Sequence, residues 1–209
     1  MSGTKTLRRL ETHLAASVAV AAAASAAQAV VITWNINQAI PASLDGFYIK
    51  IDTQQLVSTA GSALPGWDIN PYGATSLSFF ASATAPNPAT TYVRTQASGG
   101  PSSLAAGTVI SAASTFANGT TAVISSGGVG ANGWQLNAVN YFGFRFHNNT
   151  TNAINYGYGA IQVGATAAAR TLLFIEYGNA GEAVTVVPAP GALALIGAAG
   201  LVGGRRRRR

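Results

Sequence analysis

Apolar and polar side chains alternate with a period of two in the middle of this chain, and this pattern limits its fold more than any other feature. Phe142, Phe144 and Phe146 are separated by Gly143 and Arg145. Residues 47–52 alternate in the same way, with Phe and Ile at every second position. A period of two turns one face of a strand toward a core and the other away from it. These segments therefore predict half-buried β-strands.

No stretch of helical length between residues 30 and 187 has convincing helical periodicity. Short runs of β-branched and aromatic residues are separated by clusters of Gly, Pro, Asn and Ser, which is the pattern of strands and turns. Without helices to cover a parallel sheet, the pattern predicts an all-β fold, an antiparallel β-sandwich that is jelly-roll-like, with a barrel as the open variant. Further strands are predicted at residues 30–35, 76–80, 90–95, 108–111, 121–125, 155–163 and 170–177.

The positive charge of the chain is concentrated at its two ends. The 209 residues include 12 Lys and Arg and carry a formal net charge of +6. Three of these basic residues lie within the first nine positions, and five form the last five. The interior has five acidic residues against four basic ones. A nucleic-acid-binding protein needs its positive charge on the folded face that meets the phosphates, so we expect no nucleic-acid partner.

The N-terminal segment has the three parts of a secretory signal peptide. A positive region with Arg8 and Arg9 precedes the uncharged, alanine-rich residues 14–27. Ala27 and Ala29 then supply the small side chains that a signal peptidase accepts. We therefore predict a signal helix, cleavage by signal peptidase after Ala29, and a mature chain that begins at Val30. An ordinary alanine-rich helix and a twin-arginine export signal are the alternatives.

The C-terminal segment also has three parts. As a helix, the fourteen apolar residues 191–204 would span about 21 Å at ~1.5 Å per residue, which is less than the ~30 Å of a hydrocarbon core. This segment therefore predicts a marginal membrane helix, with the arginines that follow it on the cytoplasmic side by the positive-inside rule. A nucleic-acid patch is the alternative for the arginine run. The parts are the proline motif Val187, Pro188, Ala189 and Pro190, the apolar residues 191–204, and the cluster Arg205, Arg206, Arg207, Arg208 and Arg209.

A proline motif, an apolar helix and a terminal arginine cluster on an exported chain resemble the PEP-CTERM sorting signal of bacterial proteins. The usual motif of that family is Val-Pro-Glu-Pro, and Ala189 stands here in place of the glutamate. The resemblance covers residues 187–209. It implies that an exosortase, an integral-membrane enzyme, processes this tail and delivers the protein to the cell surface or to extracellular polysaccharide. Residues 66–73, 142–146 and 156–160 also resemble segments of PEP-CTERM ectodomains.

Few interior side chains suit catalysis. The chain has no cysteine, which excludes thiol nucleophiles, disulfides and thiolate metal sites. A Ser-His-Asp site would have to use His147, the only histidine after residue 30, and no Gly-x-Ser-x-Gly motif is present. We expect His147 to be an exposed residue at a strand end and the protein not to be an enzyme. A hydrolase with His147 beside a carboxylate is the alternative.

Two motifs point to ligands but have simpler interpretations. Residues 128–133 match Gly-x-Gly-x-x-Gly, yet a strand-like region follows in place of the helix that would hold a pyrophosphate. We therefore predict a glycine-rich turn. Asp68 and Asn70, joined by Asp45 or Asp52, are candidate oxygen ligands for Ca²⁺, the one cofactor that stays open. A turn capped by Asp68 or Asn70 before Pro71 is the simpler interpretation.

Aromatic side chains keep one binding function open, because rings on a β-sandwich can stack on sugars. Core packing is the expected role for most of them. Trp67 with Tyr72 is the candidate sugar contact, and burial of all three tryptophans would exclude it. The aromatic residues considered are Trp34, Trp67, Trp134, Tyr72, Tyr156 and Tyr158.

The sequence thus predicts a signal peptide at residues 1–29, an exported β-sandwich domain at residues 30–187 and a sorting tail at residues 188–209. The expected function is a non-enzymatic bacterial surface or matrix protein that passes through a membrane-anchored intermediate. Its expected partners are signal peptidase, exosortase and the membrane. The alternative is a module that binds extracellular polysaccharide.

Overall fold

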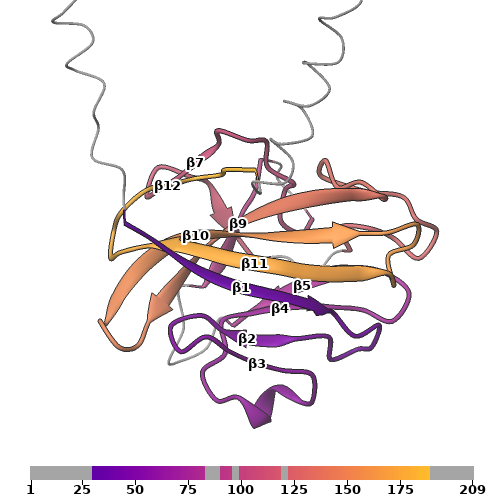
Figure 1. Ribbon diagram of the computed structural model, residues 1–209, viewed down its shortest axis with the longest axis horizontal. Coiled ribbons are helices and arrows are strands. Elements are labelled where there is room, and N and C mark those ends of the chain that lie inside the picture. Colours follow the sequence, from indigo (N-terminus) through magenta and orange to yellow (C-terminus); the bar gives the residue numbers. More distant parts are fainter. Residues whose placement is uncertain (1–29, 83–89, 96–98, 119–121, 189–209) are drawn as a thin grey trace, which may run out of the picture. The chain divides into compact units, whose positions relative to one another are not determined.

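The computed structural model describes residues 30–82, 90–95, 99–118 and 122–188, and within them the fold is all-β with antiparallel strand pairing. The predicted all-β class with antiparallel pairing is thereby confirmed (Figure 1). The described part of the chain has one helix, the short 3-10 turn η1 (Gly61–Ala63), and no helix there is both long and apolar enough to span a membrane. The predicted signal helix and tail helix lie outside the described residues.

Three antiparallel sheets make up this domain. The largest has the strand order β1-β11-β10-β9-β6-β8, the second has the order β3-β2-β4-β5, and the third pairs β12 with β7. The strands of the largest sheet are β1 (Val31–Ala39), β6 (Thr91–Val93), β8 (Phe116–Ala117), β9 (Ala138–Asn148), β10 (Ala153–Val163) and β11 (Arg170–Gly178). The others are β2 (Tyr48–Lys50), β3 (Gln55–Val57), β4 (Ile69–Tyr72), β5 (Ser78–Ala81), β7 (Val109–Ile110) and β12 (Val184–Thr185).

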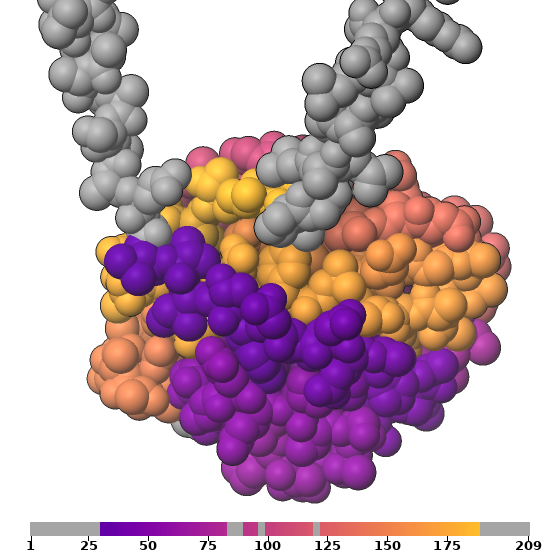
Figure 2. All heavy atoms as spheres, in the orientation of Figure 1, coloured from indigo at the N-terminus to yellow at the C-terminus, as the bar shows by residue number. Residues whose placement is uncertain are grey.

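The main hydrophobic core lies between the six-stranded and the four-stranded sheets, as in a β-sandwich. Phe142, Phe144 and Phe146 project from β9 and are fully buried. Ile49 of β2 and Phe79 of β5 meet them from the other sheet, with the Phe79 and Phe142 ring centroids 5.0 Å apart. In Figure 2, β1 (indigo) lies between the four-stranded sheet (purple) and β11 and β10 (yellow to orange), to whose sheet it belongs. The jelly-roll variant of the sandwich stays a prediction.

A second hydrophobic core covers the opposite face of the six-stranded sheet. Tyr156 and Tyr158 of β10 project to this side, where they pack with Ile110 of β7 and Val184 of β12. This explains why β10 is buried along nearly its whole length, whereas β9 has half-buried residues such as Tyr141, Arg145 and His147 between its buried ones. The half-buried strand that the sequence predicts at residues 142–146 is therefore found in β9, and the burial of β10 on both faces is what the pattern did not predict.

Glycines of β9 and β10 make room for the aromatic rings of the neighbouring strand. Phe142 is paired with Gly159 and Phe144 with Gly157 on the main-core face. A Cβ at Gly159 would lie 2.5 Å from Cζ of Phe142, and one at Gly157 would lie 2.7 Å from Cζ of Phe144. On the opposite face Tyr158 is paired with Gly143, where a Cβ would meet the aliphatic side chains of Val93, Leu104 and Ile110. Glycine at these positions is thus a packing requirement, because a ring or an aliphatic side chain occupies the volume of the missing side chain.

Four carbonyl groups hold a single buried guanidinium at one end of the sandwich. Arg170, at the start of β11, is 3% exposed. Its Nη1 donates to the carbonyl oxygens of Ser76 and Ala167, and its Nη2 donates to those of Pro41 and Gly73. Burial lowers the pKa of Arg170 to about 10. Because its acceptors come from separate loops, Arg170 ties these loops to the large sheet.

Several strands differ from the sequence-based expectation. Residues 68–72, predicted as a capped turn, include β4, whose Pro71 is paired with Phe79 of β5. The predicted strand at residues 121–125 has only bridge pairing, from Ile124 to Leu77 and Gly130, among the residues described. The two results have different causes. Pro71 weakened the strand signal at β4. The apolar residues near 124 fill the core without a continuous ladder. The short strands β3, β8 and β12 were not predicted, because two or three residues show no period.

Candidate functional site

Three aromatic rings gather on the outer side of the four-stranded sheet, and we call Tyr48, Trp67 and Phe80 the aromatic cluster. The Tyr48 and Trp67 ring centroids are 5.1 Å apart with an interplanar angle of 68°. The Trp67 and Phe80 centroids are 5.7 Å apart with an angle of 45°. Phe80 is 42% exposed, and the other two rings are half-buried. The tilted rings do not form one flat platform, but they present a joined apolar surface to solvent.

The period of two places the cluster outside the core. In β5, Phe79 is fully buried while its neighbour Phe80 points outward. In β2, Tyr48 precedes the fully buried Ile49. Gly61 closes the cluster on one side, since a Cβ there would lie 2.7 Å from Tyr48 Cε1 and 3.0 Å from Trp67 Nε1. Glycine at this position lets η1 pack directly against the two rings.

A carboxylate borders the aromatic cluster. Burial raises the pKa of Tyr48, and the negative charge of Asp45 raises it further, as does a hydrogen bond between the two side chains. Tyr72 is close enough to contribute to the same rise in the pKa of Tyr48. The cluster therefore combines apolar ring faces with hydroxyl and carboxylate groups at its border. This combination suits a ligand that has both apolar faces and hydroxyl groups.

The three tryptophans have different environments. Trp134 is 3% exposed, and its Nε1 donates to the Pro101 carbonyl at 2.8 Å, so it belongs to the core. Trp34 and Trp67 are half-buried. The condition that would have excluded a sugar contact, burial of all three, is not met. Tyr48 and Phe80 were not singled out from the sequence. The signal that could have found them is that each is an aromatic residue at an outward-facing position of an alternating strand. The pairing of Trp67 with Tyr72 as a sugar contact stays a prediction.

The start of the predicted sorting motif is attached to the large sheet, in an arrangement that we call the Val187 anchor. The Val187 amide donates to the Tyr158 hydroxyl at 3.3 Å, and this hydroxyl also lies 3.4 Å from the Val187 carbonyl oxygen. The Tyr158 hydroxyl donates in addition to the Glu176 carboxylate. Burial, together with this hydrogen bond, raises the pKa of Tyr158 well above its ordinary value. Tyr158 therefore stays protonated and able to donate at neutral pH.

The Val187 anchor connects both ends of the described chain. Thr33, near the start of β1, donates from Oγ1 to Glu176 at 3.3 Å. Thr33, Glu176 and Tyr158 are cross-strand neighbours on β1, β11 and β10. The side chain of Val187 is 52% exposed although its backbone is held. The anchor thus fixes the main chain at Val187, close to the last described residue, and leaves the side chain accessible.

The other predicted processing residues fall into two groups. Val30 is 64% exposed immediately before β1, and Pro188 is half-buried. Outside the described residues lie Ala27, Ala29, Ala189, Pro190 and the cluster from Arg205 to Arg209.

His147 is held between two asparagine side chains at the turn that joins β9 to β10. Its Nδ1 lies 3.1 Å from Oδ1 of Asn149, and its Nε2 lies 3.2 Å from Oδ1 of Asn152. Both ring nitrogens therefore have amide oxygens as partners, and the hydrolase alternative needs a carboxylate in that place. The placement of His147 at a strand end is as the sequence predicts, but its side chain is half-buried rather than exposed.

The candidate calcium ligands mostly have partners within the protein. Asp68 is 1% exposed and accepts from the Ile51 amide at 2.8 Å, and burial raises its pKa to about 7. The side-chain Nδ2 of Asn70 donates to the carbonyl oxygens of Asp45 and Phe47. Oδ2 of Asp52 accepts from the Asn149 amide at 3.1 Å. The described residues contain no group of three or more acidic, His or Cys side chains that could hold a metal ion. Calcium binding stays a prediction.

The Gly-x-Gly-x-x-Gly match forms a turn, as predicted. The Gly128 amide donates to the Ser125 carbonyl, and Gly128 and Gly133 have positive φ angles of 77° and 83°. Trp134 and the following residues lead into β9, so the helix that a dinucleotide site requires does not follow this turn.

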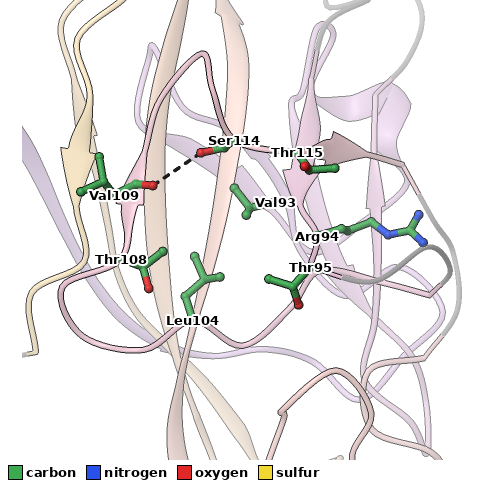
Figure 3. Close-up of a pocket in the computed structure, with 8 residues that line it drawn as sticks. All are labelled: Val93, Arg94, Thr95, Leu104, Thr108, Val109, Ser114 and Thr115. Carbon is green, nitrogen blue, oxygen red and sulfur yellow. Dashed lines mark hydrogen bonds between the residues drawn. The ribbon is translucent and has the colours of Figure 1, made fainter.

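A cavity of about 420 Å³ lies beside β6 and β7 (Figure 3). Its walls carry Val93, Leu104 and the hydroxyl groups of Thr108 and Ser114. Arg94 also borders it, but the guanidinium points away from the centre of the cavity in Figure 3. The charge of Arg94 is therefore not directed into the cavity, and the mixed apolar and hydroxyl lining indicates no particular chemistry.

Comparison of the chain with protein-family models, with curated proteins and with solved structures finds no match.

Proposed function

We propose that the protein is an exported, non-enzymatic surface or matrix protein of a bacterium, delivered through a sorting tail of the PEP-CTERM type. A signal peptidase removes residues 1–29 by cleavage before Val30. The proline motif, apolar helix and arginine cluster hold the chain in the membrane, with the arginines in the cytoplasm, until an exosortase processes the tail. The domain from residue 30 to 187 is the delivered part.

The observation that carries this proposal is the position of the motif relative to the fold. Val187 is the first residue of the predicted motif, and its backbone is hydrogen-bonded to the Tyr158 hydroxyl of the large sheet. The predicted motif therefore starts at a residue that is itself attached to the domain. Thr33 and Val187 are both connected to the sheet through Glu176 and Tyr158. Two membrane-directed segments that leave neighbouring points of one domain are compatible with a topology in which both ends are cytoplasmic.

Two variants of the arginine cluster test the proposal. Replacement of residues 205–209 by glutamine removes the positive charge, and we expect loss of surface delivery and accumulation of unprocessed chain. Replacement of the same residues by lysine keeps the charge, and we expect the membrane topology to persist, because the positive-inside rule depends on positive charge. Cell fractionation and the intact mass of the surface species are the measurements. Unchanged delivery of the glutamine variant would contradict the proposal.

A second candidate function, polysaccharide binding, is favoured by the aromatic cluster. Exposed Phe80 and half-buried Tyr48 and Trp67 form a joined apolar surface next to Asp45. Ring faces of this kind stack on the apolar faces of sugar rings. The neighbouring tyrosine hydroxyl donates hydrogen bonds to sugar hydroxyls or accepts them, and the carboxylate accepts them.

Binding of the mature protein to a glycan array tests this second candidate. We expect Trp67→Ala and Phe80→Ala to lower the signal about fivefold or more, as truncation of a central aromatic contact does in other interfaces. Val129→Ala is the control, because Val129 is 70% exposed and lies outside the aromatic cluster. Equal signals from the two cluster variants and the control would remove the aromatic cluster as the binding site.

A further inference from the structure

A groove of about 750 Å³ lies at the open side of the sandwich, where the outermost strands of the two large sheets face each other. β1 ends the six-stranded sheet and β3 ends the four-stranded sheet. Trp34 and Gln38 of β1 form one wall, and Gln54 and Gln55 at β3 form another. The volume is within the range of about 300–1,000 Å³ that is typical of small-molecule clefts.

The lining of this groove is polar and aromatic but carries no ionisable side chain. It includes the Trp34 indole and three glutamine side chains, together with apolar residues of β3 and of the segment after η1. Each glutamine amide offers two donors and one acceptor oxygen. An indole face with several amides and no charge matches an uncharged ligand that has many hydroxyl groups and apolar ring faces. These are the properties of a neutral sugar chain.

Two of the amides are held in place by neighbouring groups. Thr53 Oγ1 donates to Oε1 of Gln55 at 3.2 Å, which leaves the Gln55 amide hydrogens available. The Gln54 side chain is hydrogen-bonded to Tyr177, whose pKa is raised mainly by burial. Groups that are already oriented lose less conformational entropy on binding, so these amides are suited to ligand contacts.

A peptide strand is the competing occupant, because β1 and β3 are edge strands that can accept another strand. The geometry of β1 disfavours it. The pairing of β1 with β11 is interrupted between Asn35 and Gln38, and Asn37 in this interval has a φ of 49°. Such a bulge twists an edge strand and breaks the regular spacing of its amide and carbonyl groups. The interruption lies beside Gln38, at the wall of the groove.

The groove and the aromatic cluster are separated by one short segment. Gly61 of η1 packs against Tyr48 and Trp67 of the cluster. Ala63, which ends η1, lines the groove. A polymer bound at the cluster can therefore reach the groove by crossing this segment.

We propose that the groove is a second binding site for a neutral polysaccharide chain, with the Trp34 indole as the stacking surface and the amides of Gln38 and Gln55 as hydrogen-bonding partners. This inference rests on the polysaccharide-binding function proposed above and adds a site with its own selectivity. The cluster has a carboxylate at its border, whereas the groove has no ionisable side chain in its lining.

The test uses the mature protein released from the cell surface and two probes, the neutral and the acidic fractions of the extracellular polysaccharide of the producing cells. Affinity electrophoresis in gels that contain each fraction gives the dissociation constants. We expect the neutral fraction to bind, and we expect Trp34→Ala to weaken this binding about fivefold or more. Because Trp34 packs against the core, Trp34→Ala can also unfold the protein. The exposed Gln38→Ala is therefore the second groove variant, with an expected loss of about threefold or more.

Trp67→Ala separates this inference from the function on which it rests. Loss of binding in Trp67→Ala, with parental binding in Gln38→Ala and in a folded Trp34→Ala, would overturn the groove and leave the cluster as the site. Binding of neither fraction to the parent protein would overturn polysaccharide binding altogether. Binding of the acidic fraction alone would also overturn the groove. A dimer of the parent protein that Gln38→Ala dissociates would identify a second chain as the occupant in place of a sugar.

Discussion

Replacement of Gly159 by alanine tests whether the packing of aromatic rings onto glycine determines the stability of the large sheet. A Cβ at this position would lie 2.5 Å from Cζ and 2.7 Å from Cε1 of Phe142. Phe142 is fully buried, and its ring is surrounded by those of Phe79, Tyr92 and Trp134. The ring cannot move away without displacing these neighbours, so the substitution overpacks the main core.

The expected change in the free energy of unfolding of Gly159→Ala follows from two opposing effects. Alanine within a strand is favoured over glycine by about 0.5–1 kcal/mol when nothing obstructs its methyl group. Overpacking of a core costs about 1–3 kcal/mol. We therefore expect Gly159→Ala to lower the free energy of unfolding by about 1–2 kcal/mol. For a domain of this size this corresponds to a decrease in Tm of roughly 2–8 °C.

Urea unfolding, followed by tryptophan fluorescence and circular dichroism, measures the change in the free energy of unfolding. Gly127→Ala is the matched control, because a Cβ there would meet only Ser125 Oγ at 3.8 Å. Its expected effect is within about 0.5 kcal/mol.

A double-mutant cycle isolates the contact with the ring. In a Phe142→Leu background the obstructing ring atoms are absent, so Gly159→Ala should cost at least about 1 kcal/mol less than in the parent protein. A Gly159→Ala protein as stable as the parent, or costs that simply add in the double mutant, would refute this packing argument.

Three further predictions concern single polar groups. Tyr158→Phe removes the hydroxyl bonded to Val187 and Glu176, so the Val187 amide should exchange its hydrogen faster, while Tyr156→Phe on the same strand leaves that exchange unchanged. Asp68 has a pKa of about 7 in the folded state against 3.8 as its ordinary value, so the folded state binds more protons between these pH values. Stability should fall by roughly 1 kcal/mol per pH unit as the pH rises from about 4 to 7 in chelator-treated buffer, and Asp68→Asn, which resembles the protonated form, should remove this slope. Arg170→Lys should lower the free energy of unfolding by about 2 kcal/mol or more in urea titrations, because an ammonium group cannot reach all four carbonyl acceptors; an unchanged midpoint would contradict the role of Arg170 in tying the loops.

The alternation at residues 142–146, together with β-branched and aromatic runs between turn residues, was sufficient to predict the all-β class and to locate the long strands β1, β9, β10 and β11. A period of two over several residues is a local property that survives in any β arrangement. It was not sufficient for β4, where Pro71 masks a strand that its partner β5 stabilises. Nor did it show that β10 is buried on both faces, since that depends on the distant β7 and β12.

The candidate sites also divide into those that local sequence indicates and those that depend on the tertiary structure. The two predicted terminal signals rest on order, charge and hydropathy along the chain, because lipid and water act on a segment according to its local composition, and both stay predictions. The grouping of Tyr48 with Trp67 and Phe80, the Val187 anchor and the groove at Trp34 depend on residues that are far apart in sequence. Only strand pairing and sheet packing bring such residues together, and no local pattern records which strands become neighbours.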